Sequence, residues 1–540
     1  LTTGSYNTLL GYTAGHEITT GYRNVSIGEE SMYFVTTGSL NVCVGNQTLH
    51  LNQTGNENTA LGFRACYSGT TGTANVGVGC SALKAVTGGD YNTAVGYHAL
   101  EANTTGNTNT AVGNSALDSC TTGSNNTAIG NDSLVNLTTA NAATCVGRYS
   151  GKDNTASQVT YIGTNCFYQS TTGEDNTGLG YDAGYNNTTG NYNTALGTES
   201  LFTNTTTSEC TAIGYQALYT STVASNTAVG YQAAKATTTG GNNVAVGNAA
   251  LDANTTGAAN TVVGSAAMST STTSGGCTAI GRIALYDLTT GSYNTAVGSG
   301  CGSNMTTATY NTFMGEYSGY GNDSTAQTGS YNTFYGARSG QSITSGSSNV
   351  AIGWEAGKGI ANGASNVCLG PEAGGTGVIA ASDNQLYIAR NNEGGGNATV
   401  WIYGNASGEC HQGDNQTSWS TTSDRRLKKN IVDSSKGLAE INQLRVTNFE
   451  YRLKDEIDMS EFPLANDPKQ VVLGGGQEGK LQTGIIAQEV EAVIPECINV
   501  SVAGAKTVNS DPIMWAMVNA IKELSAENTA LKARLDAAGL

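Results

Sequence analysis

The chain repeats one short apolar pattern from its first residues to about residue 370. In one unit, residues 91–96, the pattern reads Tyr-Asn-Thr-Ala-Val-Gly, so that a polar Asn precedes a short apolar run and a closing glycine. We call this closing glycine the anchor. It recurs 22 times between Gly11 and Gly370, at steps of 17 residues except for two steps of 16 and one of 21. A period this short and regular indicates a solenoid and not a series of separate domains.

Each unit is expected to form one coil of a parallel β-solenoid with two short strands and two turns. The residues Thr93-Ala94-Val95 form the first strand, and the pair Ala99-Leu100 forms a second apolar patch. The Thr-Thr-Gly that follows is typical of a turn. One coil cannot bury its own apolar side, so coils must stack with their strands paired about 4.8 Å apart. The sequence therefore predicts a mainly β rod of 22 coils over residues 1–375.

The position four residues before each anchor is almost always Asn. It is Asn in 18 of the 22 coils, and the exceptions are Ala143, Val159, Cys210 and Cys277. Identical amide side chains that stack in register form hydrogen-bonded ladders, so we expect an Asn ladder along the rod. Each coil offers only small core residues, which is a thin core for a single long rod. We therefore expect chains to associate about a common axis, most simply as a homotrimer.

Composition and charge restrict the partners. The 540 residues carry a net charge of −17, and the first 420 hold only 10 basic against 24 acidic residues. Such a surface repels phosphate, which argues against nucleic acid as a partner. No apolar run is long enough to span a bilayer, so no membrane insertion is expected. The 12 cysteines follow no metal-like spacing and are expected to be buried thiols; no metal and no cofactor are predicted.

The regular period ends after Gly370. Residues 383–388 and 398–403 are stronger strand signals separated by three glycines, which predicts a small β tip or neck over residues 376–422. Near the C-terminus, about residues 513–537 carry the heptad seam of a coiled-coil helix with one polar core position, Asn528, of the kind that fixes register. The seam consists of Met517, Ile521, Leu524, Asn528, Leu531 and Leu535.

Four motifs follow in order after the neck. Residues 423–431 read Ser-Asp-Arg-Arg-Leu-Lys-Lys-Asn-Ile, residues 438–451 hold a leucine-rich helix and Phe-Glu-Tyr, and residues 484–496 hold Gly-Ile-Ile-Ala-Gln-Glu-Val and Pro-Glu. With the terminal helix, they resemble the intramolecular chaperone domain of phage tailspikes and tail fibres, the peptidase S74 family. The resemblance implies an α+β chaperone domain over residues 423–540. The repeat resembles, more loosely, the heads of trimeric autotransporter adhesins and the shafts of phage fibres.

The resemblance places a self-cleavage site just before Ser423, between Thr422 and Ser423. A serine hydroxyl is a weak nucleophile until a base removes its proton, and Lys428 can reach the hydroxyl across a turn. Lys428 can act as this base if burial or nearby arginines lower its pKa. Ser423 is then the nucleophile, Lys428 the general base, and Asp424 orients the site or caps the next helix. The alternative is that Ser423 and Asp424 are only an N-cap. His411, the nearest histidine, is expected in a Gly-rich loop on the fibre side, where it is poorly placed as a base.

These expectations combine into a homotrimeric viral tail or side fibre for host-surface attachment, with a C-terminal chaperone that drives trimerisation and releases itself. This implies a virion location, assembly in the host cytoplasm, contact with tail or baseplate proteins, and a glycan receptor. Outward tyrosines after the anchors are candidate glycan contacts: Tyr97, Tyr181, Tyr215 and Tyr231. The alternatives are a bacterial trimeric surface adhesin and an ice- or glycan-binding solenoid without cleavage. A glycan depolymerase is disfavoured because no carboxylate pair recurs in the repeat.

Overall fold

The computed structural model divides the chain into two compact units, Leu1–Ser418 and Trp419–Leu540, and each is described here by itself. The structure describes residues 3–321, 325–375, 380–389, 400–406, 410–412, 431–450, 452, 456–461, 481–500 and 505–539. Among these residues, no helix combines the length and the apolar character that crossing a membrane requires.

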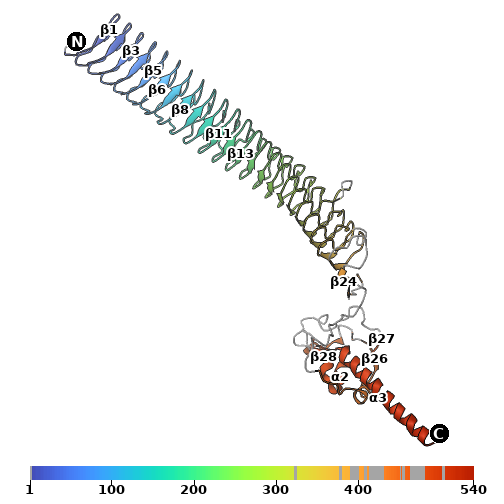
Figure 1. The fold of residues 1–540 in the computed structure, drawn as a ribbon. Coiled ribbons are helices and arrows are strands. Elements are labelled where there is room, and N and C mark those ends of the chain that lie inside the picture. Colours follow the sequence, from blue (N-terminus) through green and yellow to red (C-terminus); the bar gives the residue numbers. More distant parts are fainter. Residues whose placement is uncertain are drawn as a thin grey trace. The chain divides into compact units, whose positions relative to one another are not determined.

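The first unit is a parallel β-solenoid whose coils stack one on the next (Figure 1). Every coil contributes one three-residue strand that ends directly before its anchor glycine, and neighbouring strands pair in register, as Ala94 does with Ala111. The strands confirm the 22 coils and the repeat of about 17 residues. They are β1 (Thr8–Leu10), β2 (Val25–Ile27), β3 (Val42–Val44), β4 (Thr59–Leu61), β5 (Val76–Val78), β6 (Thr93–Val95), β7 (Thr110–Val112), β8 (Thr127–Ile129), β9 (Thr144–Val146), β10 (Thr160–Ile162), β11 (Thr177–Leu179), β12 (Thr194–Leu196), β13 (Thr211–Ile213), β14 (Thr227–Val229), β15 (Val244–Val246), β16 (Thr261–Val263), β17 (Thr278–Ile280), β18 (Thr295–Val297), β19 (Thr312–Met314), β20 (Thr333–Tyr335), β21 (Val350–Ile352) and β22 (Val367–Leu369).

The core of the rod is closed within a single chain. The middle residue of each strand points inward, and Ala94 and Leu100 are both fully buried. Where the coil interior is wider, aromatic rings fill it, as Phe313 and Phe334 do by stacking with their ring centroids 5.1 Å apart. These rings correct the expectation that every coil offers only small core residues.

Each coil has one strand and not the two that were expected. The second apolar patch is buried as predicted, but its residues form turns: His98 and Leu100 have left-handed φ angles of 55° and 53°. The backbone N–H of Leu100 donates to the carbonyl oxygen of Ala116 in the next coil at 2.8 Å. These bonds between coils hold non-glycine residues in a conformation that normally costs about 1–3 kcal/mol. The chain thereby turns its corner without losing contact with the neighbouring coils.

The Asn ladder predicted from the repeat is confirmed. The backbone N–H of Asn109 donates to Oδ1 of Asn92, one coil earlier, at 3.0 Å. The side-chain Nδ2 of Asn109 donates to the carbonyl oxygen of Gly123 at 2.8 Å. Its Oδ1 in turn accepts the backbone N–H of Asn126 at 3.0 Å. Each amide therefore satisfies buried backbone groups of two coils, which explains why the position resists other residues.

Replacing Asn109 by alanine is expected to loosen the rod locally. The change leaves the buried N–H of Asn126 without a partner and the carbonyl of Gly123 with only the weak donor Cys120 Sγ, at a cost of about 1–3 kcal/mol. Amide hydrogen exchange should show faster exchange in the coils on both sides of the substitution. The matched control is Asn114→Ala, because Asn114 is exposed and lies outside the ladder. Equal protection in the two variants would contradict the role given to the ladder.

The anchor glycines are required by both conformation and space. Gly96 has a φ of 142°, and a Cβ at this position would lie 2.3 Å from the carbonyl oxygen of Gly113 in the next coil. No side chain fits in that space. The close approach of successive anchors sets the spacing of the coils, so any other residue would force two coils apart.

The parallel stack ends in a short antiparallel extension that matches the two strand signals after Gly370. Strand β23 (Leu386–Ala389) still pairs in parallel with β22, and β24 (Val400–Gly404) then pairs antiparallel with β23. Strand β25 (Cys410–Gln412) pairs antiparallel with β24. The rings of Tyr387 and Tyr403 pack across the pair β23–β24, with centroids 5.0 Å apart.

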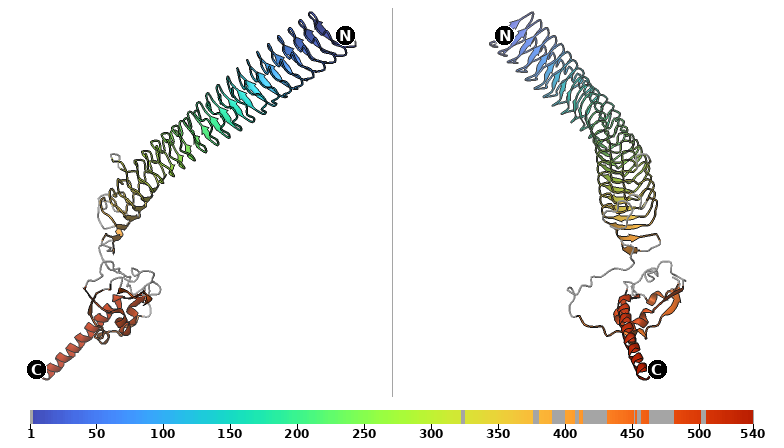
Figure 2. Two further views of the ribbon diagram at one scale, coloured as in Figure 1. Left: turned by 180° about the vertical axis from the view of Figure 1, so that it is seen from behind. Right: turned by 45° about the vertical axis from the view of Figure 1, so that its right-hand side comes forward.

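The second unit is a small α+β assembly with one long helix, α3 (Ser510–Ala537), that extends beyond its short sheets in both views of Figure 2. Two antiparallel pairs form those sheets, β26 with β27 and β28 with β29. Its other elements are α1 (Leu438–Ile441), β26 (Thr447–Glu450), η4 (Met459–Glu461), β27 (Leu481–Gly484), α2 (Ala487–Val493), η6 (Pro495–Cys497), β28 (Ile498–Val500) and β29 (Lys506–Val508).

Candidate functional site

The predicted cleavage and catalytic residues lie outside the described residues. These are Thr422, Ser423, Asp424 and Lys428. Their assignment therefore stays a prediction. His411, the alternative base, lies in strand β25 of the first unit and not in the loop where it was expected. The described residues after 430 belong to the domain that follows the predicted cleavage segment in the chain.

A small apolar core holds this domain together. The buried side chains of Val490 and Ile494, from α2 and the residue after it, pack with those of Cys497, Ile513 and Ala516. Partly buried Ile441, Leu444 and Ile485 close the core from outside. The leucine-rich helix, the segment around Gly484 and the terminal helix thus meet in space, as separate motifs of one domain should.

The two central motifs contact each other directly. Strands β26 and β27 pair antiparallel, with Phe449 opposite Gln482. A Cβ on Gly484 would lie 3.2 Å from the Phe449 ring, so the glycine makes room for the aromatic side chain. Nearby, the guanidinium of Arg445 bonds both carboxylate oxygens of Glu489 and holds the pKa of that carboxyl below its usual value. This solvent-exposed pair fixes the orientation of α2 more than it stabilises the fold.

The segment that follows the predicted cut is fastened to helix α3. The carboxylate of Glu523 accepts the backbone N–H of Leu438 at 2.8 Å, and the Asn519 amide donates to the carbonyl oxygen of Lys436 at 3.0 Å. Gly437 has no side chain where Glu523 approaches: a Cβ there would lie 2.2 Å from the carboxylate. We call these residues the α3 clamp. The clamp was not predicted from the sequence, because Asn519 and Glu523 are only two of many polar residues on this helix.

Helix α3 has two different halves. Ile513, Ala516 and Ala520 are buried against the domain, whereas every described residue from position 521 on is exposed. The apolar seam residues predicted for a coiled coil are unusually open to solvent. Their exposed fractions are 44% for Met517, 67% for Ile521, 54% for Leu524, 52% for Leu531 and 42% for Leu535, and Asn528 is exposed among them. In the single chain, this apolar seam therefore faces solvent.

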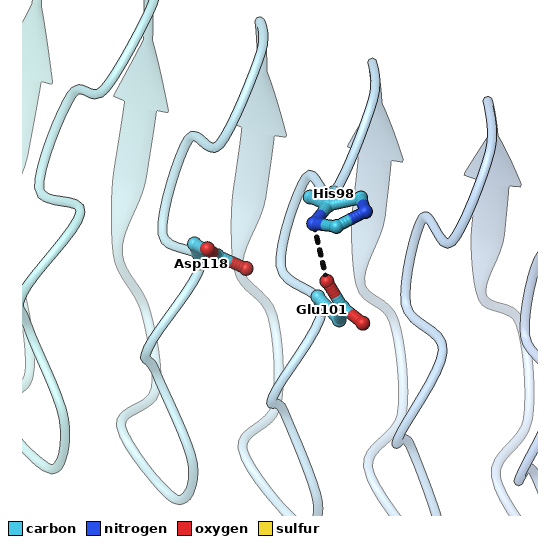
Figure 3. A group of neighbouring side chains, drawn as sticks. All are labelled: His98, Glu101 and Asp118. Carbon is cyan, nitrogen blue, oxygen red and sulfur yellow. Dashed lines mark ion pairs between the residues drawn. The ribbon is translucent and has the colours of Figure 1, made fainter.

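On the rod, one group of side chains has the composition of a metal site. The possible ligand atoms of His98, Glu101 and Asp118 lie within 4.8 Å of one another, and Figure 3 shows the three side chains on two successive coils. However, one oxygen of Glu101 already bonds the Lys84 ammonium at 2.8 Å, and the other lies 2.7 Å from Nδ1 of His98. Burial, and then the charge of Glu101, raises the pKa of Asp118. The arrangement is therefore an ion-pair network between coils.

Two further expectations concern the surface and the thiols. The exposed fractions of Tyr97, Tyr181, Tyr215 and Tyr231 are 40–52%, so these side chains are exposed as predicted.

All eleven cysteines with described side chains are free, and ten of them are buried; Cys80 is the partly exposed one. Burial raises the pKa of the ten buried thiols, and it raises that of Cys66 to about 12. They are unreactive core residues, as the sequence analysis expected.

Comparison with protein families identifies the second unit. Residues 423–499 match the family model of Peptidase_S74, whose description is chaperone of endosialidase. The match begins at Ser423 and covers the clamped segment, the paired strands β26 and β27, and helix α2. The chain thus combines a β-solenoid rod of 22 coils with a C-terminal region, residues 423–499, that is similar to Peptidase_S74, the chaperone of endosialidase, and it has a long helix near its C-terminus.

Proposed function

We propose that this protein is a homotrimeric viral tail or side fibre for host-surface attachment, and that its C-terminal domain drives trimerisation and then cuts itself off. The observation that carries the proposal is the order of the parts along the chain: a parallel rod of 22 coils, a short antiparallel extension, and then a region similar to Peptidase_S74. A parallel solenoid has many long-range strand pairs and is expected to fold slowly. A domain that holds the chains together at one end, in register, would therefore assist its folding.

Helix α3 is the part that would gather the chains. Its exposed seam repeats at intervals of three and four residues, which is the spacing that lets helices supercoil about each other. Asn528 places one polar group in that seam and would select a single register and number of helices. Because the α3 clamp fastens residues 436–438 to the same helix, assembly of α3 would also position the segment that leads back to the cut.

The cleavage itself needs only the chain and water. Neutral Lys428 removes the proton of the Ser423 hydroxyl, whose oxygen attacks the carbonyl carbon of Thr422. The C–N bond breaks as a C–O ester forms, and the proton passes to the departing amino group of Ser423. Water then hydrolyses the ester and regenerates the serine hydroxyl. Products are a rod that ends at Thr422 and a released domain that begins at Ser423.

Release of the domain explains why the cut is useful. Once the C-terminal domain has been released, the trimer cannot dissociate by reversing the pathway through which it assembled. Its stability then depends on the rate of unfolding. The rod that remains would present its outward tyrosines to a host glycan, while other virion proteins hold the fibre in the tail. Assembly would take place in the host cytoplasm.

Charging the seam of α3 is expected to prevent trimerisation. In the variant Leu524→Lys/Leu531→Lys, two ammonium groups per chain would have to enter the helix interface, so the freshly made chain should sediment as a monomer or aggregate. The control Ala526→Lys/Ala533→Lys adds the same charge to exposed positions away from the seam and should still sediment as a trimer. Analytical ultracentrifugation distinguishes the two. Trimers in both variants would contradict the role given to α3.

A further inference from the structure

The rod has one continuous face that carries no charge. The strand residues one and three positions before each anchor point outward, and in none of the 22 coils is either of them buried. The position next to the anchor is Leu, Ile, Val or Met in every coil except one, where it is Tyr335; the other position is always Thr or Val. We call these two rows, over β1–β22, the strand face. The charged residues of the rod all lie at other positions of the repeat.

The exposed apolar residues of the rod are concentrated on and beside this face. The strand face is flanked by two rows, the residues five positions before and one position after each anchor. Of the 30 large hydrophobic residues that are exposed in the described part of residues 3–375, 27 lie in the strand face or in these flanking rows. The flanking rows contribute mainly tyrosines, such as Tyr91 and Tyr97. Only Tyr22, Phe34 and Tyr286 lie elsewhere. Scattered apolar residues on a monomer would not be confined in this way.

The size and shape of the face point to a partner of the same period. A strip one to two residues wide and 22 coils long exposes on the order of 1,000 Å², which exceeds an ordinary monomer patch and matches the ~800 Å² that each partner buries in a stable interface. Each row contains one residue from every coil, so its residues repeat at the spacing of stacked strands. A surface that meets them over their whole length must repeat at that same spacing, and another copy of this chain does so.

We propose that the strand face is the surface through which the rods of three copies pack together along a common axis. This inference rests on the proposed homotrimer and names the surface that makes it. Thr and Val methyl groups and the aliphatic row of one rod would pack against the same rows of its neighbours, and the flanking tyrosines would close the edges of the contact. The two strand-face rows bring no charge into the interface, and the charged residues of the flanking rows, such as Arg23 and Glu29, would stay at its solvent-exposed edges. This arrangement avoids the cost of burying unpaired charges.

Cysteine accessibility on the assembled full chain tests this placement. Ile129→Cys and Ile280→Cys place thiols on the strand face, 39% exposed in the single chain at each position. The matched control, Thr122→Cys, places a thiol on an exposed Thr-Thr-Gly turn. All three are made in a Cys80→Ser/Cys410→Ser background, since the other cysteines are buried. Maleimide labelling and a bis-maleimide that spans about 10 Å, the spacing of packed sheets, are then applied.

In the assembled trimer we expect the two strand-face thiols to label at least tenfold more slowly than the Thr122 thiol and to cross-link between chains. A trimer in which Ile129→Cys and Thr122→Cys label equally fast and neither cross-links would overturn the strand face and leave the proposed trimer standing. Single rods in ultracentrifugation would overturn both. Single rods that adsorb to ice or to an insoluble polysaccharide through this face would assign it to a different partner and reject the inference.

Discussion

Replacing Ser423 by alanine is expected to leave the chain whole. Without the hydroxyl, no ester can form with the carbonyl of Thr422, and the loss of the reaction should be complete within detection. The wild-type chain should give two pieces, residues 1–422 and 423–540, which denaturing gels and intact mass measurement identify by their new ends. Since removal of a serine nucleophile abolishes catalysis by several orders of magnitude in comparable sites, this is the largest single effect that we predict.

Matched controls separate chemistry from folding. Lys428→Ala should also stay whole, whereas Lys429→Ala keeps the candidate base and should be cut. Ser435→Ala alters another serine on the same side of the cut and should be cut as the wild type is. If the Ser423→Ala chain is cut at the same bond, the serine is not the nucleophile, and the N-cap interpretation of Ser423 and Asp424 is preferred.

A chain made without residues 423–540 is expected to fail to form soluble trimers. The closed core of each coil, as at Ala94 and Leu100, would allow single rods to form. Their strand faces would stay uncovered, however, and nothing would hold three chains in register while the rods fold. Uncovered flat β surfaces of low charge associate in many registers, so we expect aggregated material and, at most, a small soluble fraction.

The comparison chain is the full-length Ser423→Ala variant. It keeps the chaperone domain but cannot release it, so it should trimerise with wild-type yield and differ only in being uncut. Size-exclusion chromatography with light scattering measures both yield and mass. If the chain that ends at Thr422 gives the same trimer in the same yield, the domain is not needed for assembly, and the chaperone function proposed here is wrong.

The repeat allowed much of the rod to be predicted from the sequence. Glycine at the anchors, Asn four residues earlier and a mostly apolar residue two positions before the anchor correspond to the tight coil contact, the amide ladder and the inward strand position. The glycine recurs in all 22 coils and the Asn in 18 of them, so the period is visible without any tertiary information. The strand pairing then follows, because coils of equal length must stack in register.

The corner of each coil was not predictable in the same way. Ala99 and Leu100 are apolar and were taken as a second strand, but Leu100 adopts a left-handed φ that its residue type does not favour. Bonds to the neighbouring coil stabilise that conformation, and a single repeat does not reveal them. For the same reason the sequence underestimated the core: stacked rings such as Phe313 and Phe334 come from different coils and are adjacent only in the folded rod.

In the chaperone domain the motifs were visible but their contacts were not. The exposed seam of α3 follows from heptad spacing, whereas Asn519 and Glu523 reach back over more than 80 residues of sequence to bind positions 436 and 438. Contacts over such separations leave no periodic trace. The catalytic assignment of Ser423 and Lys428 rests on their motif, so it depends most on experiment.

The mass of the assembled wild-type particle under native conditions tests the central claim most directly. We predict a particle of three chains, each ending at Thr422, together with a separate fragment that begins at Ser423. A particle of one uncut chain would contradict both assembly and release.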